Sequence, residues 1–259
     1  MALLWSWAFW LPAALGDQRV ASPPTSILYA VGGLGPPLAA LLLLYTVDTA
    51  TACRDYWRRL LDATRIGARW WAVVLLLPPS MSGLGILTHT VQTGNLPRLE
   101  FPSWFLATPA IIIPWALFIL IFGPLPEELG WRGYALEHLQ GRWSALVASS
   151  IVGALWALWH LPQFFVEGTY QYGLGFGSAS FWLFMAVLLP ESVLITWVYN
   201  NTRRSTLSAV LLHFMTNATG ELLGLPDLAE YHRAAWEFGV ATGVVLLFGP
   251  KTLRQRLRC

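Results

Sequence analysis

The sequence has few charged residues, one lysine and two cysteines. Asp, Glu, Lys and Arg account for 12% of the 259 residues, about half of the proportion that soluble domains carry. The net charge of +2 is too small to indicate nucleic acid as a partner. Hydrophobic residue types make up 56% of the chain. These proportions exclude a water-soluble globule and favour a helical protein that crosses a membrane several times.

Long apolar runs follow one another along the chain. A spanning helix needs roughly 20 apolar residues, so eight such spans take about 160 residues and leave only short connections. We therefore expect an all-α fold, a single transmembrane domain over residues 1–259, with about eight helices around a polar cavity. The predicted spans are Ala2–Leu15, Ile27–Val47, Trp70–Thr88, Ser103–Phe122, Ser144–His160, Phe181–Tyr199, Leu207–Leu223 and Ala234–Phe248.

The first run is the shortest of the eight. A secretory signal peptide begins with basic residues, and none precede this run. Tryptophan is common where helices meet the membrane interface. The run is therefore interpreted as a short, Trp-rich first helix, and whether it crosses the membrane stays open.

Basic residues are distributed unevenly between alternate connections. One set holds 13 Lys and Arg, whereas the other holds only Arg19, Arg98 and Arg233. Cytoplasmic connections carry the excess of positive charge, so we expect the C-terminus, and with eight spans also the N-terminus, in the cytoplasm of a plasma-membrane protein. Cys53 and Cys259 then face a reducing compartment, and no disulfide is expected. The first set comprises residues 48–69, 123–143, 200–206 and 249–259.

The stretch Arg54–Asp62 mixes charged and aromatic residues at roughly helical spacing. It fits an amphipathic helix on the anionic inner leaflet and equally a basic loop that sets topology. Prolines inside or beside the spans predict kinks. They are Pro36, Pro37, Pro78, Pro79, Pro109, Pro114 and Pro190.

Two glutamates follow a proline-rich turn at Gly123–Pro126. Carboxylates in a first helical turn face the positive end of the helix dipole. Glu128 and Arg132 are four residues apart and can pair on one helix face, which leaves Glu127 free to point elsewhere. A solvated, capped helix end is the alternative interpretation of this motif.

Other polar residues interrupt the apolar spans. His160 ends a Trp-rich span and fits either a site residue or an interfacial anchor. His213 and Asn217 share one helix face, where they fit either a polar cavity or interhelical hydrogen bonding. Glu191 lies in the middle of a span, and either lines the same cavity or is neutral and hydrogen-bonded. Polar groups at membrane depth are costly and commonly mark function.

Simple counting puts these groups at different depths. Glu127 begins a helical segment on the cytoplasmic side, and His213 lies one to two turns into a helix from the same side, whereas His160 ends its span near the far side. A bent or re-entrant segment that lines a cavity would bring the three together. The lead-in Gly123–Pro126 permits such a segment.

In combination the motifs resemble the CPBP intramembrane proteases, the CAAX prenyl protease and bacteriocin-processing family. The resemblance rests on Glu-Glu-x-x-x-Arg at 127–132, a histidine at 160 that ends an aromatic-rich helix, and His-x-x-x-Asn at 213–217. It covers roughly Leu117–Gly220, taken as the protease core (117–220). Trp156 stands where the family usually has phenylalanine, a change that leaves the histidine's role intact and can reshape the pocket.

The resemblance implies an intramembrane endopeptidase. Glu127 is then the general base that activates water, and Glu128 and Arg132 support its segment. His160 shares the water or orients Glu127. The remaining pair, His213 and Asn217, donates to the oxyanion, in keeping with donors aimed where negative charge develops.

The resemblance also leaves a metal-dependent mechanism open. In that case Glu127, His160 and His213 form a set like the His₂Glu zinc sites. The zinc signature His-Glu-x-x-His is absent from the sequence, and asparagine is a poor zinc ligand. A glutamate mechanism without a cofactor is therefore favoured.

The substrate is expected to be a membrane-associated protein or peptide. Relatives remove the last three residues of prenylated proteins or process bacteriocin peptides. Fifteen arginines against one lysine suggest a GC-rich bacterial genome, and the substrate is left unnamed. Two other functions stay open, namely a non-catalytic peptide-binding or immunity scaffold and a small proton-coupled transporter, although no inverted repeat supports transport.

Overall fold

The computed structural model describes residues 1–16 and 18–254, apart from the side chains of Trp104 and Leu106. Every regular element in these residues is a helix, which confirms the all-α prediction. Cys259 and the basic residues after 254 lie outside the described residues. The elements are α1 (Ala2–Leu15), α2 (Thr25–Gly33), α3 (Gly35–Thr46), α4 (Ala50–Leu61), η1 (Ala63–Arg65), α5 (Ala68–Thr93), α6 (Ser103–Ala107), η2 (Pro109–Ile111), α7 (Ile112–Phe122), α8 (Pro124–Gly130), the π-helical turn η3 (Trp131–Ala135), α9 (Leu136–Gln140), α10 (Ala145–His160), η4 (Leu161–Phe165), α11 (Tyr170–Leu174), α12 (Ala179–Asn201), α13 (Thr206–Leu223) and α14 (Asp227–Phe248).

Four helical segments are long and apolar enough to cross a membrane, and a fifth is gained if α2 and α3, bent by 41°, count as one. The chain is therefore a multi-pass membrane protein. The predicted first, seventh and eighth spans form α1, α13 and α14, which do not reach that length and apolarity, so the total of eight stays a prediction. The four segments are Ala68–Thr93, Pro109–Gln140, Ala145–Phe165 and Ala179–Asn201.

Some predicted boundaries were wrong. The run Ser103–Phe122 is divided into α6, η2 and α7, because Pro109 lacks an amide hydrogen and disfavours helical geometry at Thr108. The last helix begins at Asp227 instead of Ala234, and Asp227 and Glu230 lie in its first turn, where the helix dipole favours them.

The predicted kinks have mixed outcomes. The second run breaks at Leu34, just before Pro36 and Pro37 in the first turn of α3. Proline fits a first helical turn because no amide donor is needed there. The helices α5 and α12 continue through Pro78, Pro79 and Pro190, and a kink within them stays a prediction.

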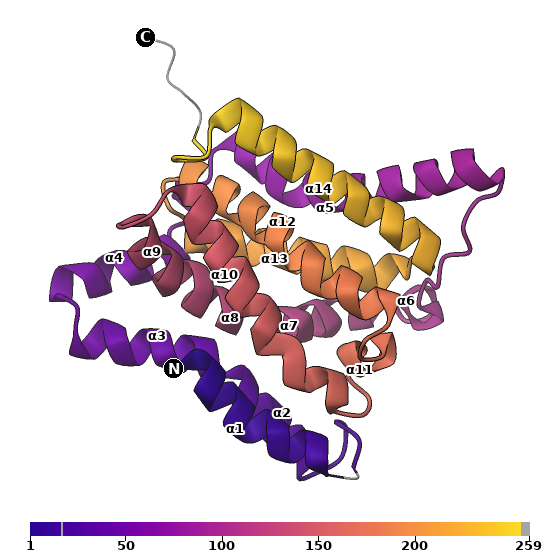
Figure 1. The fold of residues 1–259 in the computed structure, drawn as a ribbon, viewed down its shortest axis with the longest axis horizontal. Coiled ribbons are helices and arrows are strands. Elements are labelled where there is room, and N and C mark those ends of the chain that lie inside the picture. The colour runs from indigo at the N-terminus through magenta and orange to yellow at the C-terminus, as the bar shows by residue number, and fades with distance from the viewer. Residues whose placement is uncertain (17, 255–259) are drawn as a thin grey trace.

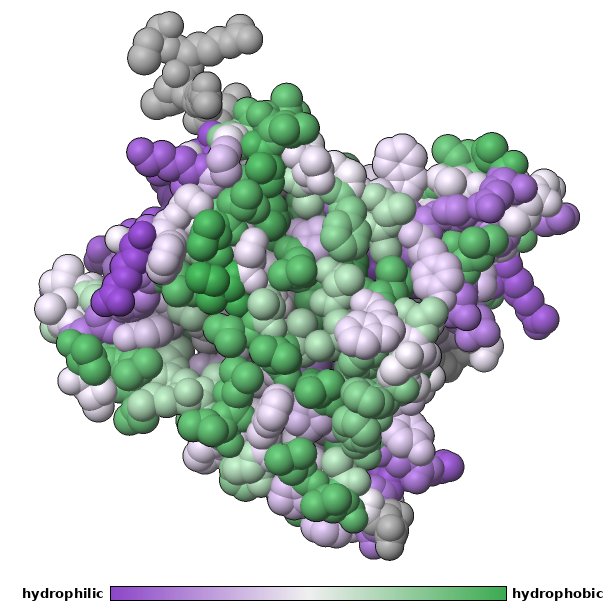
Figure 2. All heavy atoms as spheres, in the orientation of Figure 1, coloured by the Kyte–Doolittle hydropathy of each residue, from purple (hydrophilic) through white to green (hydrophobic). Residues whose placement is uncertain are grey.

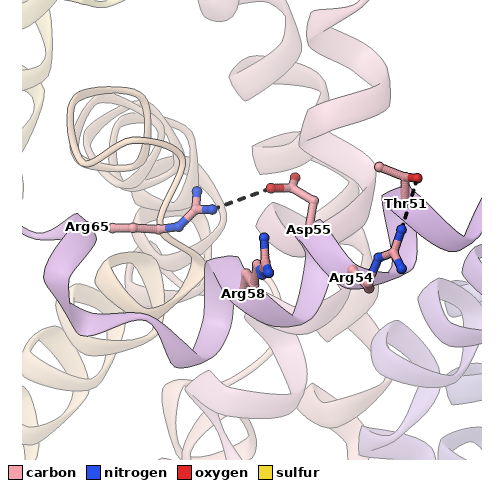
Figure 3. Close-up of a pocket in the computed structure, with 5 residues that line it drawn as sticks. All are labelled: Thr51, Arg54, Asp55, Arg58 and Arg65. Atoms are coloured by element: carbon pink, nitrogen blue, oxygen red, sulfur yellow. Dashed lines mark hydrogen bonds and ion pairs between the residues drawn. The ribbon is translucent and has the colours of Figure 1, made fainter.

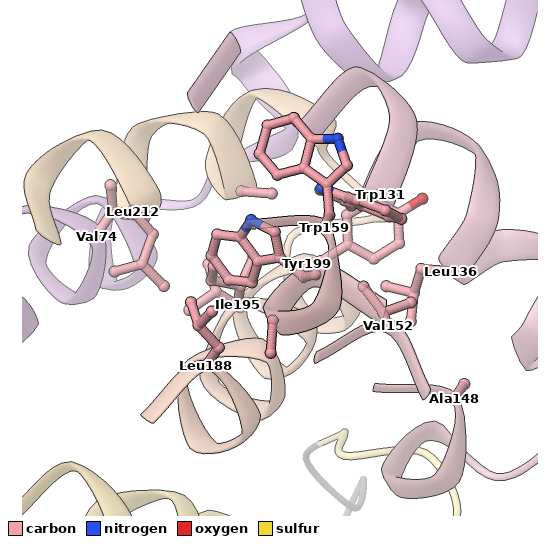
Figure 4. Packing of buried hydrophobic residues seen from close by; sticks show 14 of the residues in the cluster. Val74, Trp131, Leu136, Ala148, Val152, Trp159, Leu188, Ile195, Tyr199 and Leu212 are labelled. Carbon is pink, nitrogen blue, oxygen red and sulfur yellow. The ribbon is translucent and has the colours of Figure 1, made fainter. Parts of the chain in front are cut away.

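The helices pack in pairs around a Trp-rich core. In Figure 1, α14 runs beside α5, while α10 packs on α12. Figure 4 shows the core seen from close by, with aromatic and branched side chains from several helices meeting. Its labelled members are Val74, Trp131, Leu136, Ala148, Val152, Trp159, Leu188, Ile195, Tyr199 and Leu212.

Much of the outside of the molecule is apolar. Figure 2 shows hydrophobic side chains over the middle of the visible face and hydrophilic ones gathered toward its edges. Large hydrophobic side chains remain exposed on many helices, among them Leu4, Leu76 and Leu246, each more than half exposed. An exposed apolar surface of this extent fits contact with lipid.

The stretch Arg54–Asp62 does form a helix, α4, as one of its two interpretations predicted. Its buried face braces the turn η3. The hydroxyl of Tyr56 donates to the carbonyl of Leu129 at 3.0 Å, and Arg59 Nη2 donates to the carbonyl of Gly133 at 3.0 Å. A π-helical turn is rare and has i→i+5 backbone hydrogen bonds. These two side chains add further contacts to backbone carbonyls in the segment that follows Glu127.

The close packing of α10 on α12 gives a test of the fold. A Cβ atom at Gly153 would lie 2.9 Å from the carbonyl oxygen of Leu188 and 3.0 Å from Ser192 Cβ. We expect Gly153→Ala to lower the free energy of unfolding in detergent by about 1–3 kcal/mol through overpacking. Gly83→Ala is the control, because a Cβ there meets nothing within 4 Å. Equal stability of the two variants would contradict the packing.

Candidate active site

The short helix α8 carries both glutamates into the protein interior. Pro124 occupies its first turn, and Glu127 also lies in that turn, where the positive end of the helix dipole favours a carboxylate. At the other end, a Cβ at Gly130 would lie 2.5 Å from Pro36 Cβ, so α8 is pressed against α3. Glu127 is 8% exposed and Glu128 is fully buried, which differs from the solvated helix end that was the alternative.

Glu128 is the centre of a buried charge network. Arg132 Nη1 donates to Glu128 Oε1 at 2.7 Å, and both side chains are fully buried. His213 Nδ1 lies 3.0 Å from the same oxygen. An ionised carboxylate oxygen can only accept hydrogen bonds. Glu128 Oε1 therefore accepts from both residues, and Nδ1 is the donor on His213. The network therefore joins α8, η3 and α13.

Trp156 connects Glu127 to the two histidines. Its indole Nε1 donates to Glu127 Oε2 at 2.6 Å. The guanidinium of Arg132 lies 4.9 Å from the centre of the Trp156 ring, and the ring of His213 meets Trp156 edge-on with centroids 4.9 Å apart. The described residues give Glu127 Oε1 no hydrogen-bond partner.

His160 is buried one turn after Trp156. Its Nδ1 donates to the backbone carbonyl of Trp156 at 2.9 Å. In the neutral ring this leaves Nε2 as an acceptor. The rings of Trp159 and Phe184 pack edge-on against the imidazole, with centroids 4.8 and 5.2 Å away, and they hold its orientation.

Asn217 lies beside the start of α8. Its Nδ2 would be 3.6 Å from a Cβ built on Gly123, and its side chain makes no hydrogen bond with the described residues. The amide is therefore free to donate to another group. It sits one turn after His213 on α13, as the sequence predicted.

The sequence put Glu127 and His160 near opposite sides of the membrane, but the folded chain does not separate their two motifs. Glu127 lies inside the 32-residue segment Pro109–Gln140, one of the candidate spans, and not at its end. Trp156 reaches it from the second half of α10, and His160 lies against Trp156. The structure thus brings residues from the three motifs together, while their chemical roles stay predictions.

The predicted metal ligands do not form a ligand set in this arrangement. Among the described residues, no three His, Cys, Asp or Glu side chains are grouped so that they could hold a metal ion. Glu127 and His213 instead take up hydrogen bonds with Trp156 and Glu128. As they lie in this structure, the three predicted ligands do not form a metal site, and the choice between a glutamate and a metal mechanism stays a prediction.

Glu191 is buried at 9% exposure, but makes no hydrogen bond with the site residues described above. A second charged group, which the sequence interpretation did not identify, lies on α14. There Arg233 Nη1 donates to buried Glu237 Oε2 at 2.6 Å. The spacing of four residues between Arg233 and Glu237 could have signalled this pair.

The sequence interpretation also missed the polar contact made by Trp156, which it treated only as an aromatic residue. The exchange of a family phenylalanine for tryptophan was the available signal, because indole has an N–H group and phenyl has none. Tyr29 was missed as well. It donates to the buried Gln163 at 3.2 Å, just after His160.

Comparison with known proteins finds similarity over the part of the chain that carries the three motifs. The family model for Type II CAAX prenyl endopeptidase Rce1-like proteins matches residues 109–219. CAAX prenyl protease 2 of Methanococcus maripaludis is 32% identical over 216 residues, which cover 83% of this chain and 79% of the relative. The match to the family model includes Glu127, His160, His213 and Asn217.

The charge network predicts a particular pattern of stability. Arg132→Leu takes the guanidinium away from the buried Glu128 carboxylate and leaves His213 as its remaining partner. We expect the free energy of unfolding in detergent to fall by about 3–5 kcal/mol. Adding Glu128→Gln removes the buried carboxylate charge and should restore part of the loss. Chemical denaturation of both variants tests this. A double variant no more stable than Arg132→Leu would show that the pair is not coupled.

Proposed function

Because the chain belongs to the Type II CAAX prenyl endopeptidase Rce1-like family, we propose that Glu127 activates the water with which this membrane protease hydrolyses peptide bonds. Membership of the family supports intramembrane endopeptidase activity. The observation that carries the proposal is the buried carboxylate of Glu127, held by Trp156 through Oε2 alone. The other oxygen, Oε1, is left for a water molecule.

In the proposed reaction Glu127 acts first as a base. Oε1 takes a proton from water, and the water oxygen attacks the peptide carbonyl carbon. His160 Nε2 accepts a hydrogen bond from the other O–H of the water, because its Nδ1 already donates to the Trp156 carbonyl. When the C–N bond breaks, Glu127 returns its proton to the leaving amine. General acid–base catalysis of this kind contributes typically about 10²–10⁴-fold in rate.

The oxyanion is stabilised by His213 and Asn217 in this proposal. Asn217 has a free amide donor. For His213, Nδ1 faces Glu128, so Nε2 donates only if the ring is an imidazolium. A protonated His213 together with Arg132 balances the charges of Glu127 and Glu128. Each donor to an oxyanion is worth about 3 kcal/mol of transition-state stabilisation.

The substrate class proposed for this chain is a membrane-associated protein that ends in a prenylated CAAX sequence. It is taken from the name of the relative, CAAX prenyl protease 2. An apolar exterior supports entry of such a lipidated chain end from the bilayer. The peptide-binding scaffold remains the second candidate, and hydrolysis distinguishes the two.

The first test is cleavage of a farnesylated CAAX peptide by the purified protein in detergent. Wild type should release the C-terminal tripeptide, and Glu127→Gln should lower kcat by at least about 10²-fold, since the amide cannot take a proton. Far-ultraviolet circular dichroism shows that the variant is folded. Equal cleavage by both proteins would remove Glu127 from the mechanism. Binding of the peptide without cleavage by either would favour the scaffold.

The hydrogen bond from Trp156 gives a second test. Trp156→Phe keeps an aromatic ring and removes the indole donor to Glu127. Hydrogen bonds to charged groups contribute about 1.5–3 kcal/mol, so we expect kcat to fall by roughly 10- to 100-fold, with little change in KM. Trp182→Phe is the control, because Trp182 is 65% exposed. A loss confined to KM would contradict a role in orienting the carboxylate.

A further inference from the structure

The helix α4 has three faces with different surroundings. Tyr56 and Arg59 are buried against the segment that follows Glu127. Residues 53, 57 and 61 form a second face. There Trp57 Nε1 donates to the hydroxyl of Tyr45 at 2.9 Å, and Leu61 is 75% exposed. An exposed leucine beside an amphipathic aromatic pair is typical of the membrane interface.

The third face of α4 lines a pocket. Thr51, Arg54, Asp55 and Arg58 recur at spacings of three and four residues, so they share this face, and Arg65 closes the pocket from the chain after α4. Figure 3 shows the side chains of Arg58 and Asp55 between Arg54 and Arg65. The cavity has a volume of about 480 Å³.

The charges in the pocket are unbalanced. Its single carboxylate, on Asp55, already lies close to three arginines other than Arg54 and Arg58. Asp55 lies 3.0 Å from Arg59 Nε, 3.4 Å from Arg65 Nη2 and 3.6 Å from Arg204 Nη2.

Arg54 and Arg58 have no ion pair with any described residue. Arg54 makes only a long hydrogen bond to Thr51, at 3.5 Å. Both side chains are exposed. The pocket thus presents two guanidinium groups without a carboxylate, one helical turn apart.

We propose that this pocket binds a phosphate group, from an anionic lipid or from a soluble anion. Guanidinium groups match phosphate oxygens through paired N–H donors. The adjacent face with Trp57 and Leu61 puts the arginines at the level of lipid headgroups, where basic residues are attracted to an anionic surface. This proposal is independent of the proposed protease function.

Binding by the delipidated full chain in an uncharged detergent tests the proposal. Dioctanoyl phosphatidylglycerol and dioctanoyl phosphatidylcholine are titrated by native mass spectrometry, and radiolabelled inorganic phosphate by equilibrium dialysis. We expect Arg54→Gln/Arg58→Gln to weaken binding of the preferred phosphate probe at least about tenfold, since two charged donors are lost. Arg69→Gln/Arg142→Gln removes the same charge from exposed positions outside the pocket and should bind as wild type.

The two sources of phosphate give different results. Tighter binding of phosphatidylglycerol than of free phosphate assigns the pocket to a lipid headgroup, and the reverse order assigns it to a soluble anion. Phosphatidylcholine should bind at least about tenfold more weakly than phosphatidylglycerol, because its choline cation opposes the arginines. Unchanged affinity in Arg54→Gln/Arg58→Gln, an equal loss in the control variant, or no binding of any phosphate probe would overturn the proposal.

Discussion

The organisation of the site depends on the buried ion pair between Glu128 and Arg132. An ion removed from water costs several kcal/mol, and a partner at close range is what makes the burial tolerable. Glu128 Oε1 has two such partners, Arg132 Nη1 at 2.7 Å and His213 Nδ1 at 3.0 Å. Once these contacts form, α8 is attached to α13, and the direction of the neighbouring Glu127 is set by the helix.

Contacts from outside the charge network hold the same segment. Gly130 allows α8 to lie directly on Pro36 of α3, while Tyr56 and Arg59 of α4 donate to the carbonyls of Leu129 and Gly133. Because α4 also carries the arginine pocket, a ligand bound there would contact a helix that braces the candidate site. The interfacial helix and the buried carboxylates are thus parts of one packed unit.

The helical class and the residues of the three motifs could be predicted because their signals are local. Apolar runs predict helices, and a spacing of four residues predicts the ion pair Glu128–Arg132 and the shared helix face of His213 and Asn217. The break at Thr108 lies at Pro109, one of the prolines predicted to cause a kink, whereas the hydropathy pattern alone gave one continuous run. The hydrogen bond from Trp156 to Glu127 and the bracing by Arg59 depend on how distant helices pack, and a sequence pattern contains no such distances. Glu237 was missed for another reason. The predicted span Ala234–Phe248 was identified by its apolar residues, and the charged residues in the first half of α14 were not considered together.

The most direct test of the account is an experimental structure with a bound peptide phosphinate that mimics the tetrahedral intermediate. We expect one phosphinate oxygen to lie on Glu127 Oε1, with His160 close by. The other oxygen should lie about 3 Å from both His213 Nε2 and Asn217 Nδ2. An inhibitor bound away from these side chains, or in the site with no contact to Glu127, would contradict the central claim.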